Sequence, residues 1–364
     1  MVVKKRQIDF YFLTLVIILL SFGLVMVFSA SSESSRVLQG DAYFFIKRQA
    51  IWAVVGLVVM IIMSKIPYDK WKSLSKIAMV VAFALLILVL VIGKNTNGGK
   101  RWISLGAMQF QPSEVAKIAI IIFLAAIIEK NQKILPQFVR GLLPLLLLVG
   151  AVAGLILFEP HMSAAMVIVM VSCIMLICGG AKIKHFLLMG LAAMPALAAM
   201  IIMAPYRLKR VTTFLDPFKD KLGDGWQIIQ SLYAIGSGGL FGLGLGRSRQ
   251  KFLYIPEPHN DFIFSILCEE LGLLGALVVI LLFALLIYRG IRIAMRAPDV
   301  FSCLLATGIM CLIAVQVIIN IAVVTSSMPV TGMPLPFFSY GGTTLLINLA
   351  SMGIMLNISR YGEK

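Results

Sequence analysis

Long apolar runs follow one another along almost the whole chain. Each has the length of about 17 to 25 residues that crosses a hydrocarbon layer of ~30 Å as a helix. The runs predict membrane spans at approximately 10–30, 46–64, 74–93, 112–129, 140–158, 161–179, 183–203, 262–288, 300–326 and 338–359. The pattern therefore predicts an all-α membrane protein with about ten transmembrane helices.

A long polar segment, 204–261, separates the seventh run from the eighth. Inside it, Gly225 to Ile235 has the pattern of an amphipathic helix at the membrane surface, ended by Gly236. The glycines up to Gly246 then predict a turn-rich loop whose backbone can approach a ligand or a helix. The sequence offers no separate soluble domain, so we expect one integral-membrane domain over 1–364.

Composition agrees with this pattern. The chain is 60% hydrophobic and 13% charged, with a mean hydropathy of +0.99, which is too apolar for a soluble core. The short alternating segments of an outer-membrane barrel are not its pattern. The first run follows basic residues as a signal peptide would, but its length and the spans after it indicate a retained helix.

The formal net charge of +16 does not point to nucleic acid, because the basic residues are dispersed among the loops. One set of short loops carries Lys4, Lys5, Arg6, Lys65, Lys70, Lys72, Lys76, Lys130, Lys133, Arg140, Lys182, Lys184, Arg289, Arg292, Arg296, Arg360 and Lys364. The opposite set carries Arg36, Lys47, Arg48, Lys94, Lys100 and Arg101. The positive-inside rule therefore predicts that both termini are cytoplasmic and that 204–261 lies outside.

Asp261 stands at the outer start of the eighth run, after Pro256 and Pro258. The prolines restrict the approach of the chain, and the N-terminus of a helix favours an ionised carboxylate. This residue is our first candidate for chemistry. The residues alone leave a catalytic carboxylate and an exposed helix cap equally open.

A charged pair lies at the start of the fourth run, where Glu114 and Lys117 follow Pro112. Residues three apart share a helix face, so the two can form an ion pair. Each charge within a span costs about 2.5–3.5 kcal/mol on insertion scales, so such residues usually face a partner or a cavity. A structural ion pair and a polar site both stay open.

The fourth, eighth and tenth runs all begin on the predicted outer side. This topology brings Glu114, Lys117, Asp261 and the segment Pro336–Gly342, which contains Ser339, to one membrane depth. Cationic residues on the same side are Lys100, Arg101, Arg207, Lys209, Arg210, Arg247, Arg249 and Lys251. A carboxylate among cations beside apolar helices suits a substrate with a lipid tail and a phosphate-rich head.

Other residues carry weaker signals. Glu269 lies about 80° round the helix from Asp261 and Glu270 about 180°, so both are expected to pack against polar neighbours. The three histidines have no metal-ligand spacing, and no serine or cysteine triad is supported. The five cysteines fall inside apolar runs without paired spacing, so we interpret them as packing residues.

Several motifs together carry a family likeness. They are Gly99–Ile103, Gln111–Glu114 with Lys117, Pro256–Glu257 with His259, Asp261–Phe264, Glu269–Gly272, Pro334–Phe337 and Ser339–Gly342. In their order and spacing, over nearly the whole chain, the sequence resembles the SEDS family, which comprises RodA, FtsW and SpoVE. The segments most similar to the FtsW and SpoVE branch are Ala204–Arg207, Arg210–Thr212, Phe214–Pro217, Gln227–Leu232, Asn320 and Val323–Thr325.

The chain departs from the family pattern at three places. Asn260 stands where threonine is usual, and Thr343 with Thr344 where a serine pair is common. Glu159–His161 replaces Gln-Pro-Asp. Because a histidine replaces the acid, the resemblance supports no carboxylate role at position 161.

The resemblance implies a peptidoglycan glycosyltransferase that polymerises lipid II at the outer face of the bacterial cytoplasmic membrane, for cell division or sporulation-type wall synthesis. It implies a class B penicillin-binding protein, a transpeptidase, as partner, with other divisome or elongasome membrane proteins and no nucleic acid. Asp261 occupies the family's catalytic position. The candidate substrate-binding residues are Arg101, Glu114, Lys117, Arg207, Arg210 and Ser339.

In the implied reaction, we expect Asp261 to act as general base on the 4-hydroxyl of an acceptor sugar. Cations such as Arg101, Lys117, Arg207 or Arg210 would neutralise the leaving lipid pyrophosphate. The sequence contains no dedicated metal cage, so Mg²⁺ or Mn²⁺ would be held by Asp261 together with substrate phosphates. No organic cofactor is expected.

Two other functions stay open, a lipid II flippase and a non-catalytic scaffold that recruits a transpeptidase. A flippase needs a polar path that reaches both leaflets. The ionisable residues within the spans instead gather on the predicted outer side, apart from Glu269 and Glu270. This distribution favours the enzyme, and a scaffold would tolerate substitution of Asp261, Glu114 and Lys117.

Overall fold

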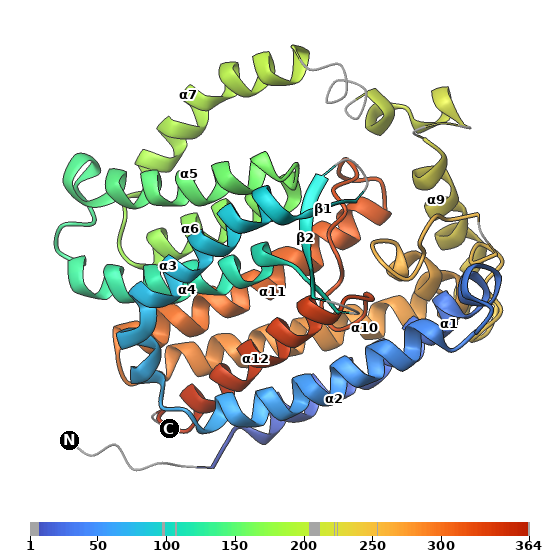
Figure 1. Ribbon diagram of the computed structural model, residues 1–364, viewed down its shortest axis with the longest axis horizontal. Coiled ribbons are helices and arrows are strands. Elements are labelled where there is room, and N and C mark those ends of the chain that lie inside the picture. Colours follow the sequence, from blue (N-terminus) through green and yellow to red (C-terminus); the bar gives the residue numbers. More distant parts are fainter. Residues whose placement is uncertain are drawn as a thin grey trace.

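The computed structural model describes residues 7–96, 99–105, 108–203, 212–221, 223, 225–252 and 254–362, and helices dominate it (Figure 1). The long helices are α1 (Phe10–Gln39), α2 (Phe44–Lys65), α3 (Tyr68–Ile92), α4 (Pro112–Asn131), α5 (Leu143–Phe158), α6 (Met162–Cys178), α7 (Ile183–Ile202), α10 (Ile263–Met295), α11 (Val300–Val324) and α12 (Gly342–Ser359). The shorter elements are the strands β1 (Lys94–Thr96), β2 (Gly99–Leu105) and β3 (Met108–Phe110), the π-helical turn η1 (Phe138–Leu142), the 3-10 turn η2 (Pro217–Asp220) and the helix α9 (Trp226–Gly238).

Each predicted apolar run coincides with one of the long helices, which confirms the predicted all-α membrane fold. By length and hydropathy, seven helical segments in the described part of the chain can cross a membrane. They are α1, α2, α3, η1 with α5, α10, α11 and α12. The apolar helix α6 and the first part of α7 (183–192) are shorter.

The predicted end of the first run is wrong, because α1 continues to Gln39. Its added turns contain serines such as Ser31, Ser34 and Ser35, which are buried in the protein. Polar side chains can therefore extend the helix without meeting lipid. The helix ends at Gly40, whose φ of 73° is the left-handed conformation that glycine supplies at helix C-termini.

The start of α1 and the end of α12 meet at one end of the bundle. The backbone N–H of Asp9 donates to Ser359 Oγ at 3.1 Å, and Arg289 Nε of α10 lies 2.8 Å from Asp9 Oδ2. The rings of Tyr68 and Tyr361 pack edge to face there, with centroids 5.1 Å apart. Both ends of the described chain therefore lie at the same end of the bundle, and the cytoplasmic assignment of this end stays a prediction.

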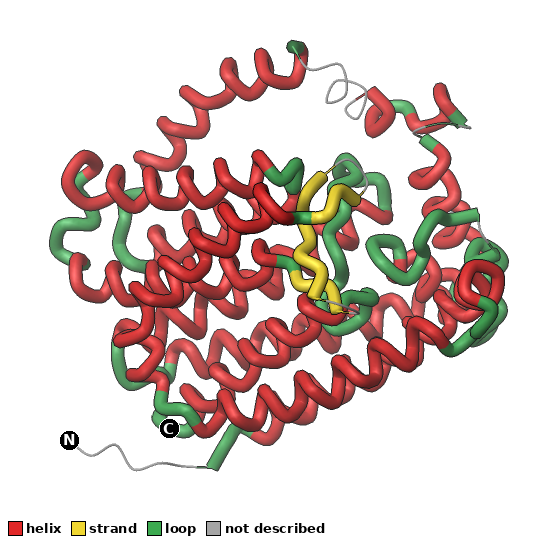
Figure 2. The backbone as a smooth tube through the Cα atoms, in the orientation of Figure 1, coloured by secondary structure: helices red, strands yellow, loops and turns green. Residues whose placement is uncertain are grey.

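The opposite end carries α9, the strands and most of the long loops (Figure 2). The strands form an antiparallel sheet in the order β1-β2-β3, which the sequence did not predict. A helix was predicted at 225–235, but α9 continues to Gly238. It also packs into the protein, because Ser231 Oγ lies 2.7 Å from Ser265 Oγ of α10 and donates to the Val324 carbonyl of α11 at 2.7 Å.

The helix α11 forms the centre of the bundle, packed against α4, α6 and α10. It is apolar on all sides, as expected for a helix with protein rather than lipid around it. The consecutive residues Leu304, Leu305 and Ala306, whose side chains point about 100° apart round the helix, are all buried. The polar Asn320 near its last turn is equally buried, and it reaches the loop before α10.

Candidate active site

Asp261 lies two residues before α10 begins, at the end of the molecule that carries α9. The N-cap of α10 is Phe262, and no side chain caps this helix. The structure therefore excludes the alternative that Asp261 is only a helix cap. Its half-buried carboxylate faces the loop between α11 and α12, where a Cβ on Gly332 would lie 3.2 Å from Asp261 Oδ2. Gly332 also has a φ of +68°, so glycine is favoured there by both space and conformation.

The surroundings of Asp261 change its acidity. Burial, followed by the negative charge of Glu257, raises the pKa of Asp261 to about 6, against the opposing effect of Arg101. An ordinary aspartate has a pKa of about 3.9. Asp261 is therefore mostly ionised at neutral pH and is a stronger base than an exposed aspartate.

Arg101 of β2 lies at the centre of the charged groups at this end. It donates hydrogen bonds to the backbone carbonyls of Glu159, at 3.3 Å, and Pro160, in the turn between α5 and α6. Its positive charge acts on Asp261, Glu159 and His161. The strand β2 thus places a cation whose charge acts on the carboxylate of Asp261.

Glu114 and Lys117 of α4 form the ion pair that was one of the two interpretations left open, and their role in a polar site stays a prediction. Lys117 Nζ lies 2.8 Å from Glu114 Oε1, and both side chains are almost fully buried. His161 is close by, because its Nδ1 lies 3.3 Å from Ser113 Oγ and the charge of Lys117 acts on its ring. The pair therefore belongs to the same polar region as Arg101.

Glu159 is a carboxyl group of this region that the sequence did not single out as functional. The side chain is fully buried, and neither carboxyl oxygen has a hydrogen-bond partner within the described residues. Burial raises the pKa of Glu159 to about 8, while Arg101 lowers it. Glu159 is therefore mostly protonated at neutral pH.

Ser339 holds the loop that precedes Asp261. Its Oγ donates to the carbonyl of Asn260 at 2.6 Å and accepts from the backbone N–H of Leu335 at 2.8 Å. The backbone N–H of Tyr340 donates to the His259 carbonyl at 2.9 Å. These bonds give Ser339 a positioning role, and its direct contact with a substrate stays a prediction.

Residues of α2 that the sequence did not indicate contact both the loop between α11 and α12 and the loop before Asp261. Gln49 Nε2 donates to the Ser339 carbonyl at 3.2 Å, and Gln49 Oε1 accepts from the backbone N–H of Gly341 at 3.2 Å. The ring of Phe45 packs against that of His259, with centroids 4.2 Å apart. A buried glutamine in an apolar run was the signal that could have revealed this contact.

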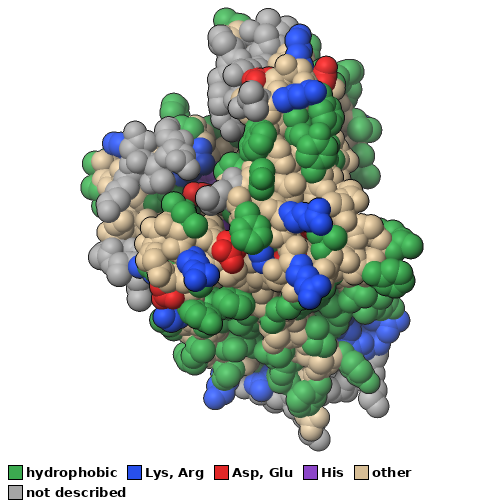
Figure 3. All heavy atoms as spheres, turned by 90° about the vertical axis from the view of Figure 1, so that its right-hand side faces the viewer, with side chains coloured by type: hydrophobic (Ala, Val, Ile, Leu, Met, Phe, Trp, Pro, Cys, Tyr) green, Lys and Arg blue, Asp and Glu red, His purple; other side chains and the backbone are tan. Residues whose placement is uncertain are grey.

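Two of the predicted cations, Arg207 and Arg210, lie outside the described residues. Figure 3 shows basic and acidic side chains together, among apolar ones, on the end of the molecule that carries α9. Charges of both signs act on Asp261, from Glu257 and Arg101. In the described part of the chain, no three His, Cys, Asp or Glu side chains form a metal-binding group, so a divalent cation at Asp261 would need oxygens from a substrate.

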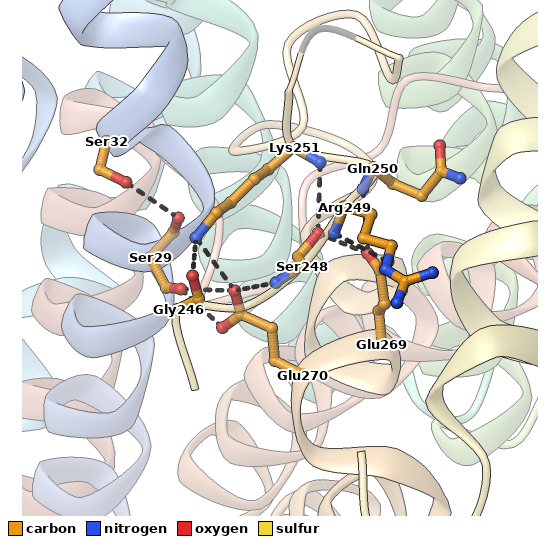
Figure 4. Close-up of polar contacts among 9 residues, drawn as sticks. All are labelled: Ser29, Ser32, Gly246, Ser248, Arg249, Gln250, Lys251, Glu269 and Glu270. Carbon is orange, nitrogen blue, oxygen red and sulfur yellow. Dashed lines mark hydrogen bonds and ion pairs between the residues drawn. The ribbon is translucent and has the colours of Figure 1, made fainter. Parts of the chain in front are cut away.

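The side chains of Glu269 and Glu270 lie away from Asp261 and contact the loop that follows α9 (Figure 4). Glu269 accepts hydrogen bonds from the backbone N–H groups of Arg249 and Gln250, and Glu270 accepts from Ser29 Oγ. The prediction that both glutamates pack against polar neighbours is confirmed. The glycine-rich loop also approaches a helix, as predicted.

The whole chain is similar to proteins of bacterial wall synthesis. A family model for FtsW, RodA and SpoVE, described as "Cell cycle protein", matches residues 10–364. Stage V sporulation protein E of Bacillus subtilis (strain 168) is 46% identical, with 100% of both chains covered. A "Probable peptidoglycan glycosyltransferase FtsW" of Geobacter sp. (strain M18) is 42% identical over 96% of each chain.

Two solved structures share the fold. A chain from a structure described as "Structural coordination of polymerization and crosslinking by a peptidoglycan synthase complex" is 31% identical, with a TM-score of 0.81 over 97% of this chain and 98% of that one. The rod shape determining protein RodA of Thermus thermophilus is 28% identical, with a TM-score of 0.74 over 98% of each chain.

Proposed function

This chain belongs to the FtsW, RodA and SpoVE family of cell cycle proteins, and we propose that it is a peptidoglycan glycosyltransferase that polymerises lipid II. Its curated relatives include several named peptidoglycan glycosyltransferases. The observation that carries the proposal is the half-buried carboxylate of Asp261 within the field of Arg101 at one end of an apolar bundle. The positive-inside rule puts this end outside the cytoplasmic membrane. The glycan would serve division or sporulation.

In the proposed reaction, the 4-hydroxyl of an acceptor sugar attacks the anomeric carbon of a donor. The bond from that carbon to the lipid pyrophosphate breaks, and the hydroxyl proton passes to Asp261. Even at a pKa of about 6 the carboxylate is too weak to remove the proton beforehand, so proton transfer accompanies attack. General-base assistance of this kind supplies roughly 10²- to 10⁴-fold in rate.

The remaining acceleration would come from positioning and from neutralising the leaving pyrophosphate. Arg101 and Lys117 are two described cations of this region, and Arg207 and Arg210 are further candidates. Mg²⁺ or Mn²⁺ would supply the same neutralisation. Asp261 suits such an ion, because the repulsion from Glu257 is relieved when a cation binds.

We also propose that the chain works with a class B penicillin-binding protein that crosslinks the glycan, beside other membrane proteins of the division or elongation machinery. The similarity to a chain of a peptidoglycan synthase complex supports this pairing. A transpeptidase acts on the strands that a polymerase extends. Placing the two activities on one side of the membrane therefore suits the chemistry.

The flippase alternative is less well supported. In transporters, a broken helix at mid-membrane often leaves backbone carbonyls free to bind the transported solute. The helix α10 is broken at Gly272, but the carbonyls of Glu269 and Glu270 accept hydrogen bonds from the backbone N–H groups of Leu243 and Gly244, each at 2.9 Å. The break is thus filled by the protein's own loop.

The test is to incubate the purified chain with fluorescent lipid II, with and without a class B transpeptidase and with and without a chelator. We expect glycan strands that a muramidase degrades. Transfer of lipid II between the leaflets of a liposome without glycan would instead support the flippase. If neither occurs and the transpeptidase still binds, the scaffold is supported and the proposal is wrong.

A further inference from the structure

The loop that leads to Asp261 is joined to α10 along its backbone. Gly272 has a φ of 67° and a ψ of −169°, which interrupts the helix. On the far side of the break, the N–H groups of Leu273 and Leu274 donate to the carbonyls of Gly239 and Leu240, at 2.9 and 3.2 Å. The N–H groups of Leu243 and Gly244 donate in turn to the carbonyls of Glu269 and Glu270. The loop after α9 therefore satisfies the backbone groups that the break leaves without partners within the helix.

The side chain of Glu269 adds a second attachment (Figure 4). It is fully buried, and it accepts from the backbone N–H groups of Arg249 at 2.9 Å and Gln250 at 3.3 Å, and from the hydroxyl of Ser248. A buried carboxylate is stable only when several donors surround it. Glu269 therefore fixes the loop segment 248–250 in one place.

The side chain of Glu270 connects three elements. It accepts from Ser29 Oγ of α1, at 2.7 and 2.6 Å to its two oxygens, and from the Ser248 backbone N–H at 3.3 Å. Lys251 Nζ lies 3.4 Å from it and donates to the Gly246 carbonyl at 2.6 Å. We call Glu269, Glu270, Ser29, Ser248 and Lys251 the acidic anchor.

The acidic anchor reaches Asp261 by two short routes. Position 269 follows position 261 by eight residues, and the helical part of that stretch, 263–269, rises about 9 Å. Along the loop, nine residues separate 251 from 261, and two of them are prolines. Trp226 Nε1 holds the first part of this loop by donating to the Tyr254 carbonyl at 2.6 Å. We therefore expect a displacement of the acidic anchor to displace the carboxylate of Asp261 as well.

We propose that Glu270 is a positioning residue for Asp261: with Lys251 and Ser29, it holds the loop so that the carboxylate stays half-buried beside Gly332. This proposal rests on the function proposed above. It differs from a merely structural role, which would change the amount of folded protein but not the turnover of each folded molecule. It also couples the outer end of α1 to the site, because Ser29 is the contact of α1 with Glu270.

The test uses the full chain carrying Glu270→Gln. The amide keeps the size of the side chain and can still accept from Ser29 and Ser248, but it loses the ion pair with Lys251. A cavity of about 330 Å³, lined in part by Ser29, Glu33 and Lys251, adjoins the anchor, so water can solvate the lysine in the variant. We therefore expect the variant to fold.

For Glu270→Gln, we expect the kcat for lipid II polymerisation to fall by about 10- to 100-fold, because small misplacements of a reacting group cost that much. The KM should change little. The acid limb of the pH–rate profile should move to lower pH, since a displaced loop exposes Asp261 to water. Backbone amides in peptide 254–262 should exchange their hydrogens faster than in the wild type.

The matched control is Asp9→Asn. Asp9 of α1 and Arg289 of α10 form an ion pair between the same two helices at the opposite end of the bundle. This variant should lower the unfolding temperature without changing kcat, the acid limb or exchange in peptide 254–262. An equal loss of kcat in both variants, or a Glu270→Gln variant with wild-type kcat and acid limb, would overturn the proposal.

Hydrogen exchange separates this proposal from the proposed function. If the wild-type chain forms no glycan, the glycosyltransferase assignment fails, and exchange in peptide 254–262 alone decides on the positioning role. Faster exchange in Glu270→Gln but not in Asp9→Asn supports that role. Equal exchange in the wild type and Glu270→Gln contradicts it.

Discussion

The side-chain amide of Asn320 donates a hydrogen bond to the backbone carbonyl of Asp261 at 2.8 Å. The same nitrogen donates to the carbonyl of Met333 at 2.7 Å. One buried amide thus joins the loop before α10 to the loop after α11. Because Asp261 is held by its main chain, its carboxylate is left available for a substrate.

Replacing Asn320 by Leu should lower kcat for lipid II polymerisation by at least about 10-fold, because the loop that carries Asp261 loses its tie. Each buried carbonyl left without a donor costs about 1–3 kcal/mol of stability. The control is Asn357→Leu, since Asn357 Nδ2 also donates to a buried backbone carbonyl, that of Ser64, at 2.8 Å. Both variants should lose stability in thermal unfolding, and a similar kcat loss in the control would contradict the positioning role of Asn320.

The Glu114–Lys117 pair permits a test of structure against function. Replacing Lys117 by Met leaves Glu114 charged and buried, which costs about 3–5 kcal/mol. Adding Glu114→Gln removes that charge, so thermal unfolding should show that the double variant recovers most of the stability. Polymerisation should remain low, because the cation is still missing. A double variant with wild-type activity would show that the ion pair is only structural.

The raised pKa of Asp261 predicts the pH dependence of the reaction. The base is protonated below a pH of about 6, so the rate should fall as the pH decreases through that value. The charge of Glu257 raises the pKa of Asp261, so Glu257→Gln should move the acid limb to lower pH. The substituted amide can still accept from Asn260 Nδ2, which lies 2.8 Å from Glu257 Oε2. An unmoved limb in a pH–rate profile would exclude Asp261 as the titrating base.

Glu159 predicts a pH dependence of stability. Burial raises its pKa from 4.5 to about 8, so between these values the folded chain keeps a proton that the unfolded chain has lost. The contribution of Glu159 to stability is therefore fully present below pH 4.5 and is lost as the pH rises to about 8. Glu159→Gln should be more stable than the wild type at pH 8, with a smaller difference at pH 5. Thermal unfolding at the two pH values checks this, and a variant that is less stable at pH 8 would contradict it.

The apolar runs predicted the bundle well because a membrane requires each span to be both long and apolar. Boundaries were wrong where protein instead of lipid surrounds the helix, as in the serine-rich outer turns of α1. The short strands β2 and β3 were missed, because their pairing depends on a local hairpin and not on hydrophobic periodicity. The burial of α9 against α10 likewise depends on contacts between distant segments.

The candidate site likewise contains residues that the local sequence reveals and residues that only contacts between distant segments reveal. Asp261 and the Glu114–Lys117 pair were found as charges in apolar surroundings, a signal that local sequence contains. Glu159 was not found, because its backbone packs against Gly99 of β2, a strand that the sequence did not predict. The contact of Glu270 with Ser29 spans 241 positions in the sequence, so no local pattern could reveal it.

The most direct test of the central claim is the turnover of lipid II by the purified Asp261→Asn variant. The control is Asp41→Asn, which changes an exposed aspartate paired with Lys47. With unfolding temperatures unchanged, we predict that Asp261→Asn lowers polymerisation at least about 10²-fold and that Asp41→Asn does not. Undiminished glycan synthesis by folded Asp261→Asn would contradict the assignment of Asp261 as the base.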